Sequence, residues 1–219
     1  HLSPRALTLA GSTAFALLAA APGTPPGMAD PPVAGASASA AGEAVRSPDT
    51  LPPALLAGQV IMVGIPAGWS PRRPAPLDTV PAGSVILFRR NITAGMDAAD
   101  VRHLCDDIRH YLTQRHPGMP TPIIAIDHEG GHVNRLRGIA GVTAFPSSAA
   151  QVRGLSLPEA TRKVEQIGRR MGEELAALGI DLDLAPVVDV VPDARRCAIG
   201  TRSYGADPQR VAALAAAFI

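Results

Sequence analysis

Short apolar runs alternate with longer stretches of helical periodicity through residues 51–219. A short continuous run rich in β-branched residues is typical of a buried parallel strand. By this pattern we expect strands at residues 60–65, 84–88, 122–126 and 180–189. Apolar residues that recur every three or four positions predict helices at residues 97–115, 156–178 and from 207 onward. A repeated strand–helix order indicates a parallel sheet with helices outside it.

The helix at residues 156–178 has the clearest boundary signals. Ser156 and Glu159 have the spacing of a capping box, and Pro158 suits the first helical turn. Gly179 then supplies a residue that ends helices readily.

The order of elements predicts an α/β fold of the (β/α)8 TIM-barrel type, with about the first half of the barrel present. A complete barrel takes about 250 residues, more than residues 51–219 provide, so we expect the chain to be a fragment of a longer protein. We divide it into a signal-like segment (1–29), a linker rich in Pro, Ala and Ser (30–50) and the barrel portion (51–219).

The first fifty residues differ in composition from the rest. Residues 7–21 form an apolar run behind Arg5, which resembles a secretory signal and predicts a secreted or periplasmic protein. The run is too short and too rich in small residues to predict a stable membrane span. A start at Met28 would instead predict a cytoplasmic protein. Residues 22–48 have few core-forming side chains, so we expect a disordered tail.

Charge and composition argue against nucleic acid as a partner. The 20 Lys and Arg balance the 19 Asp and Glu, and aromatic residues make up 3%, so nothing predicts nucleic-acid binding.

The two cysteines, Cys105 and Cys197, match no metal-ligand spacing. Cys105 falls on the apolar side of a predicted helix, which favours a buried thiol, although a disulfide remains open in an exported protein. No cofactor is expected, and the sequence leaves the oligomeric state unknown.

The most informative motif follows the apolar run at residues 122–126. Asp127, His128 and Glu129 stand there in front of Gly130 and Gly131. Their ionisable side chains therefore leave a predicted strand at its carboxyl end, where α/β folds place their ligand sites.

The same segment also spells His-Glu-x-x-His, a zinc-protease signature, with His128 and His132 as the candidate ligands. That motif requires both histidines one turn apart on a helix. Gly130 and Gly131 disfavour a helix by roughly 1 kcal/mol each relative to alanine. We therefore predict no metal site and keep the zinc peptidase only as a distant alternative.

Five segments in order resemble the amino-terminal barrel of glycoside hydrolase family 3, in its bacterial β-N-acetylglucosaminidase branch. They are residues 84–92, 126–136, 143–147, 179–190 and 199–208. The resemblance implies a retaining exo-β-N-acetylglucosaminidase that acts on peptidoglycan- or chitin-type sugars through a covalent intermediate.

The resemblance also implies a sugar-binding site formed by Asp127, Arg135 and Arg202. A carboxylate can accept hydrogen bonds from two neighbouring sugar hydroxyls, and arginine presents a fixed fork of donors. Asp127 has an alternative role as a cap on the following turn. Arg135 and Arg202 have an alternative in internal salt bridges with Glu129 or Asp189. We expect Glu129 to be structural and to accept backbone amides of the loop.

The family's nucleophilic aspartate and its histidine acid/base match no motif in this sequence, so we assign no catalytic residue and expect residues 1–219 alone to be inactive. His132 also stands where the family usually has arginine. Two alternatives stay open besides the N-acetylglucosaminidase: a family 3 β-glucosidase or β-xylosidase, and a non-catalytic sugar-binding relative.

Overall fold

The computed structural model describes residues 50–73 and 76–219. The signal-like segment and the linker up to residue 49 lie outside the described residues, so both stay predictions. Within the described residues, no helix combines the length and the apolar composition needed to cross a membrane.

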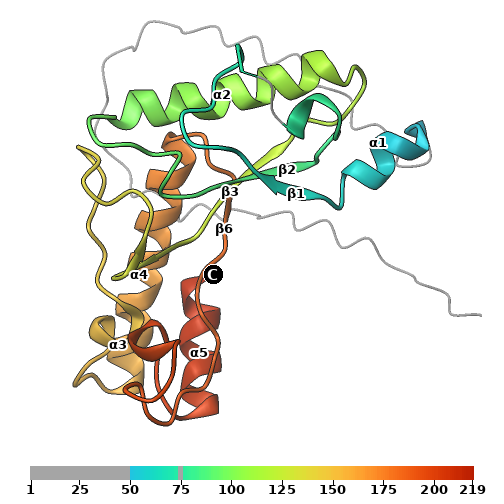
Figure 1. The fold of residues 1–219 in the computed structure, drawn as a ribbon. Coiled ribbons are helices and arrows are strands. Elements are labelled where there is room, and N and C mark those ends of the chain that lie inside the picture. The colour runs from blue at the N-terminus through green and yellow to red at the C-terminus, as the bar shows by residue number, and fades with distance from the viewer. Residues whose placement is uncertain (1–49, 74–75) are drawn as a thin grey trace, which may run out of the picture. The chain divides into compact units, whose positions relative to one another are not determined.

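Four parallel strands form the main sheet (Figure 1). They are β1 (Met62–Gly64), β2 (Ser84–Leu87), β3 (Ile123–Ile126) and β6 (Leu182–Asp183). Their order in the sheet is their order along the chain, and all three pairings are parallel. Register is continuous at the carboxyl edge, where Ile126 pairs with Leu87 on one side and with Asp183 on the other. The predicted parallel sheet and barrel-type α/β fold class are confirmed.

The fourth strand is shorter than predicted. It ends at Asp183, and the amide of Leu184 makes a last hydrogen bond to the carbonyl of Ile126 at 2.8 Å. Since β3 also ends at Ile126, it offers no backbone partner to the rest of residues 184–189. Pro186 moreover has no N–H to donate. The prediction of a strand over residues 180–189 is therefore wrong in its length.

Besides the main sheet, the described residues form five α-helices, two short 3-10 helices and a small strand pair. The helices are α1 (Pro53–Gly58), α2 (Ala98–Arg115), α3 (Ser148–Gln151), α4 (Leu157–Ala177) and α5 (Pro208–Phe218). The 3-10 helices are η2 (Pro76–Asp78) and η3 (Gly200–Arg202). A small antiparallel pair, β4 (His128–Gly130) and β5 (Val133–Asn134), follows β3 and was not predicted.

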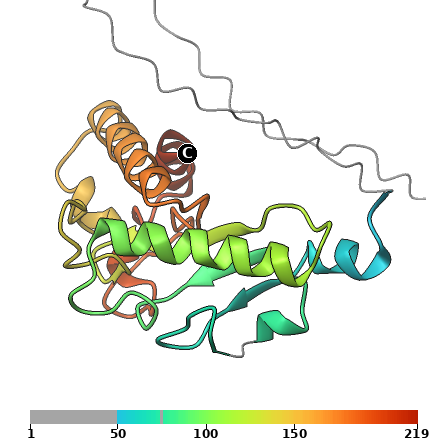
Figure 2. The same ribbon diagram turned by 90° about the horizontal axis from the view of Figure 1, so that it is seen from above.

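Helix α2 lies across the strands (Figure 2) and buries its apolar side in the main core. Asp97 caps it, accepting the amide of Asp100 at 3.0 Å. Cys105 is fully buried, and burial raises the pKa of its thiol to about 12. Cys197 is exposed, and both cysteines are free. The interpretation of Cys105 as a buried thiol is confirmed.

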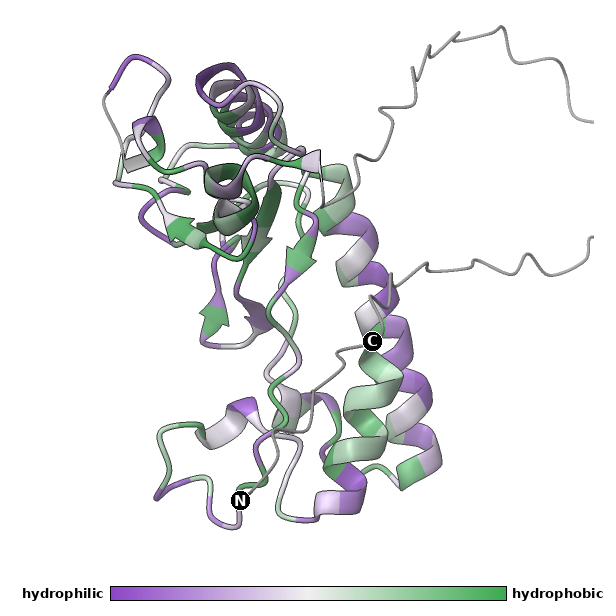
Figure 3. Cartoon of the chain, turned by 90° about the vertical axis from the view of Figure 1, so that its right-hand side faces the viewer, coloured by the Kyte–Doolittle hydropathy of each residue, from purple (hydrophilic) through white to green (hydrophobic). Residues whose placement is uncertain are grey.

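Helices α4 and α5 pack against each other, and Figure 3 shows polar residues along α4 and apolar residues along α5. The predicted capping box is present, with the amide of Ser156 bonded to the carboxylate of Glu159 at 2.9 Å. Gly179 follows the helix with a φ of +76°, a conformation that favours glycine. The boundaries predicted for this helix are therefore confirmed.

Candidate functional site

The segment after β3 leaves the sheet at its carboxyl edge and turns back through β4 and β5. Gly130 and Gly131 both have positive φ, +81° and +57°. His128 lies on a strand and is buried, whereas His132 is exposed. The helix that a His-Glu-x-x-His zinc site requires is therefore replaced here by a strand and a turn. No group of three or more His, Cys, Asp or Glu in the part of the chain that the structure describes is placed to hold a metal ion.

Asp127 and Arg135 form an ion pair at this edge. Nη2 of Arg135 donates to Oδ2 of Asp127 at 2.9 Å, and both side chains are about one quarter exposed. The recorded partner of Asp127 is thus a side chain, not a backbone amide as a turn cap would have. The pair leaves one carboxylate oxygen and part of the guanidinium group at the surface of the site.

Arg202 and Glu129 form a second ion pair beside the first. Nε and Nη2 of Arg202 each donate to a different oxygen of Glu129 at 2.7 Å. The Glu129 side chain is 5% exposed and that of Arg202 is 31% exposed. The hydrogen bonds to Glu129 raise the pKa of Arg202 further. The expectation that Glu129 accepts loop backbone amides is wrong, because both of its oxygens accept from this guanidinium group.

The two pairs bring the three predicted site residues to one edge of the sheet. Asp127 lies between β3 and β4, and Glu129 lies within β4. The charge of Asp127 also acts on Arg202, whose pKa it helps to raise. Arg202 thus forms the salt bridge with Glu129 that the sequence left open, whereas Arg135 pairs with Asp127 and not with Glu129 or Asp189. A sugar-binding role for Asp127, Arg135 and Arg202 stays a prediction.

Sequence reasoning missed Asp183, the last residue of β6. Its Oδ1 accepts the backbone amide of His128 at 2.9 Å, while its buried Oδ2 has no hydrogen-bond partner among the described residues. Burial, helped by the nearby charges of Asp127 and Glu129, raises the pKa of this carboxyl to about 7. The alternation of Asp181 and Asp183 with leucines was the available signal, but alternation alone does not separate a surface carboxylate from one facing the site.

Asp181 and His128 show how neighbouring polar residues are used structurally. Asp181 accepts from Arg109 at 2.6 Å and from the amide of Ile124 at 2.8 Å, which ties β6 to α2 and β3. The His128 ring lies edge-on to Phe145, and burial lowers the pKa of His128 to about 4. The imidazole is therefore neutral near pH 7 and forms part of the buried packing beside Phe145.

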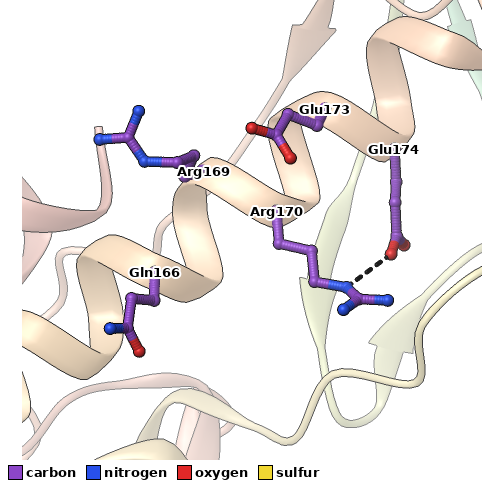
Figure 4. A pocket seen from close by; sticks show the side chains of 5 residues that line it. All are labelled: Gln166, Arg169, Arg170, Glu173 and Glu174. Atoms are coloured by element: carbon purple, nitrogen blue, oxygen red, sulfur yellow. Dashed lines mark hydrogen bonds and ion pairs between the residues drawn. The ribbon is translucent and has the colours of Figure 1, made fainter. Parts of the chain in front are cut away.

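Two cavities are lined by residues other than those of the two ion pairs. One of about 370 Å³ lies on α4 and is lined by Gln166, Arg169, Arg170, Glu173 and Glu174 (Figure 4). Within it Arg170 is paired with Glu174 at 2.9 Å. The other, of about 330 Å³, lies between α4 and β6. Neither is lined by Asp127, Arg135 or Arg202, but the second is lined by Asp183, whose pKa the charges of Asp127 and Glu129 help to raise.

Gly130→Ala is expected to destabilise the whole protein more than Gly138→Ala. Both positions have positive φ, for which alanine costs roughly 1–2 kcal/mol. At Gly130 the new Cβ would also lie 2.5 Å from the carbonyl oxygen of Pro146, whereas at Gly138 no atom lies within 4 Å. Urea unfolding of the two variants measures the difference. Equal losses of unfolding free energy would show that the close approach at Pro146 is relieved without cost.

The carboxylates and arginines lie paired at the carboxyl edge of a parallel, barrel-type α/β sheet. Proteins of this class bind ligands and carry out catalysis at that edge. Within that class, the model of the glycosyl hydrolase family 3 N-terminal domain matches residues 58–219. The chain belongs to this family.

Relatives with curated names support the family assignment. A beta-hexosaminidase of Pseudomonas aeruginosa is 38% identical over 137 residues, which are 63% of this chain and 36% of that protein. Beta-hexosaminidase LpqI of Mycobacterium tuberculosis is 40% identical over 102 residues, 46% of this chain and 25% of that protein. The chain thus spans about a third or less of the length of these relatives.

Solved structures of the same family have the same fold. A family 3 beta-N-acetylglucosaminidase from Paenibacillus matches with a TM-score of 0.65 and 28% identity, over 77% of this chain and 30% of that one. NagZ from Neisseria gonorrhoeae matches with a TM-score of 0.57 and 34% identity, over 72% of this chain and 44% of that one.

Proposed function

We propose that the whole protein hydrolyses terminal β-linked N-acetylglucosamine residues with retention of configuration. Residues 51–219 would supply one wall of the sugar site. The observation that carries the proposal is the pairing of Asp127 with Arg135 beside the Glu129–Arg202 pair, at the carboxyl edge of a family 3 sheet. The names of the relatives, beta-hexosaminidase and beta-N-acetylglucosaminidase, favour this substrate class.

The chemistry of the site suits a sugar. One oxygen of Asp127 is bonded to Arg135, which leaves the other to accept from sugar hydroxyls, and charged partners make such hydrogen bonds strong. Arg135 and Arg202 stay charged and add donors of fixed geometry. These residues bind and orient the sugar. The nucleophile and the acid/base of the retaining reaction would come from parts of the whole protein other than these residues.

We also propose export of the protein, on the basis of the signal-like composition of residues 7–21 behind Arg5. Cell-wall or chitin-type polymers would then be the accessible substrates. Recovery of a fusion of residues 1–50 to a reporter only in the cytoplasm would overturn this part of the proposal.

A substrate comparison tests the activity. The whole protein is incubated with nitrophenyl β-glycosides of N-acetylglucosamine, glucose and xylose, and the release of nitrophenol is measured. We expect the N-acetylglucosaminide to be preferred, and proton NMR of the first-formed sugar to show the β anomer. Preference for the glucoside or xyloside would assign the protein to another branch of the family. Binding without turnover of any of the three would indicate a non-catalytic sugar-binding relative.

A further inference from the structure

The Glu129–Arg202 pair has a geometry that defines one free side of the guanidinium group. Nε and Nη2 are both bonded to Glu129 at 2.7 Å. Nη1, on the opposite side of the planar group, has no recorded hydrogen-bond partner among the described residues. Because the guanidinium group is rigid, fixing two of its nitrogens also fixes the direction in which the third donates.

We propose that Glu129 is a positioning residue that holds Arg202 so that Nη1 donates to the bound sugar. The proposal rests on the hydrolase function proposed above and adds a residue to that site. Glu129 itself has both oxygens occupied and is almost completely buried, so it has no free atom for the substrate.

The two partners differ in how firmly their own elements hold them. Glu129 lies in the middle of β4, which pairs with β5, and the next residue, Gly130, is packed closely against Pro146. Arg202 ends the short turn η3, in a stretch without regular strands or long helices. The buried carboxylate on a paired strand therefore gives a fixed reference for an arginine on a loop.

Electrostatics favour the same assignment. A buried carboxylate without a partner is costly, so the site needs a cation opposite Glu129. A lysine would satisfy the charge but not the two-point geometry. The choice of arginine therefore provides both a partner for Glu129 and an additional donor pointing elsewhere.

A double-mutant cycle in the whole protein tests the proposal. Glu129→Gln keeps the side-chain size but replaces one acceptor oxygen by a donor, which breaks the fork. We expect KM for the N-acetylglucosaminide to rise by roughly tenfold or more, the loss that corresponds to a charge-assisted hydrogen bond, with a smaller change in kcat. In an Arg202→Met background the same substitution should have almost no further effect on KM.

Controls separate positioning from a general structural role. Glu165→Gln removes a carboxylate from an exposed ion pair with Arg169 and should change neither KM nor kcat. A rise in KM of equal size with and without Arg202 would overturn the proposal, since Glu129 would then act independently of that arginine. If Arg202→Met fails to fold, Arg202→Lys takes its place in the cycle.

An activity-independent measurement distinguishes failure of this proposal from failure of the proposed function. In nitrogen-15 NMR, the Nε–H signal of Arg202 should be protected from exchange in the wild type and lose that protection in Glu129→Gln. Protection without any turnover by the wild type would overturn the proposed function and leave the positioning of Arg202 supported. Absence of protection in an active wild type would overturn the positioning role alone.

Discussion

Replacing Asp127 by alanine in the whole protein is expected to lower kcat/KM for an N-acetylglucosaminide by at least about tenfold. The loss corresponds to one charge-assisted hydrogen bond to the sugar, roughly 1.5–3 kcal/mol. It is expected to exceed the effect of Glu129→Gln, because Asp127 would touch the substrate itself and also hold Arg135 at 2.9 Å. Steady-state kinetics of the purified variant measure the change.

Asp127→Asn is the matched control for this prediction. It keeps the side-chain shape and one acceptor oxygen but removes the charge, so its kcat/KM should lie between those of the wild type and Asp127→Ala. Thermal unfolding of both variants shows how far loss of the Arg135 ion pair affects the fold. Unchanged kinetics in Asp127→Ala would show that the carboxylate serves only the local structure of the turn.

The regular elements were predictable because local signals and tertiary packing agree. Helix α4 begins after the capping box of Ser156 and Glu159 and ends before the glycine at 179, as the sequence predicts. The run before Asp127 forms a parallel strand between β2 and β6, and its Ile124 and Ile126 lie in the same core as the apolar side of α2. In both places one pattern determines both the local conformation and the buried face.

The length of the fourth strand was not predictable, because strand length depends on a partner. Residues 184–189 look like a continuation of β6 in sequence, but β3 ends at Ile126 and offers them no backbone groups. The pair β4 and β5 was missed for a related reason. It spans a few residues around two glycines, which a pattern of period two does not reveal.

The candidate site was predictable in its residues but not in its partners. Resemblance to a family identified Asp127, Arg135 and Arg202 because each stands in a distinctive motif. Their pairing needs the fold, since Glu129 and Arg202 are far apart in sequence and meet only when η3 lies against β4. Asp183 was missed because its effect arises from burial near two other carboxylates.

Asp183 leads to the last prediction, which concerns stability against pH. Its pKa is about 7 in the folded protein, against an ordinary value of 3.8 for an aspartate, so between these two pH values the folded state keeps a proton that the unfolded state has lost. The stability that this group contributes is therefore fully present below about pH 4, falls as the pH rises towards 7, and is lost above that. Linkage gives an upper bound of roughly 4 kcal/mol for the total change.

Asp183→Asn removes this titration while keeping an oxygen that can accept the amide of His128. Its new amide donor would also lie near Asp127 and Glu129, whose charges help to raise the pKa of the native carboxyl. We therefore expect the variant and the wild type to have similar unfolding free energies near pH 4 and the variant to be more stable at pH 8. Urea unfolding of both proteins at intervals from pH 4 to pH 9 gives the difference directly.

All other titrating groups are common to the two proteins, so their effects on the difference cancel. This includes His128, whose protonation favours unfolding as the pH falls from 6.5 towards 4. A difference that is the same at every pH would mean that Asp183 is already ionised throughout, and that solvent or an ion reaches its second oxygen.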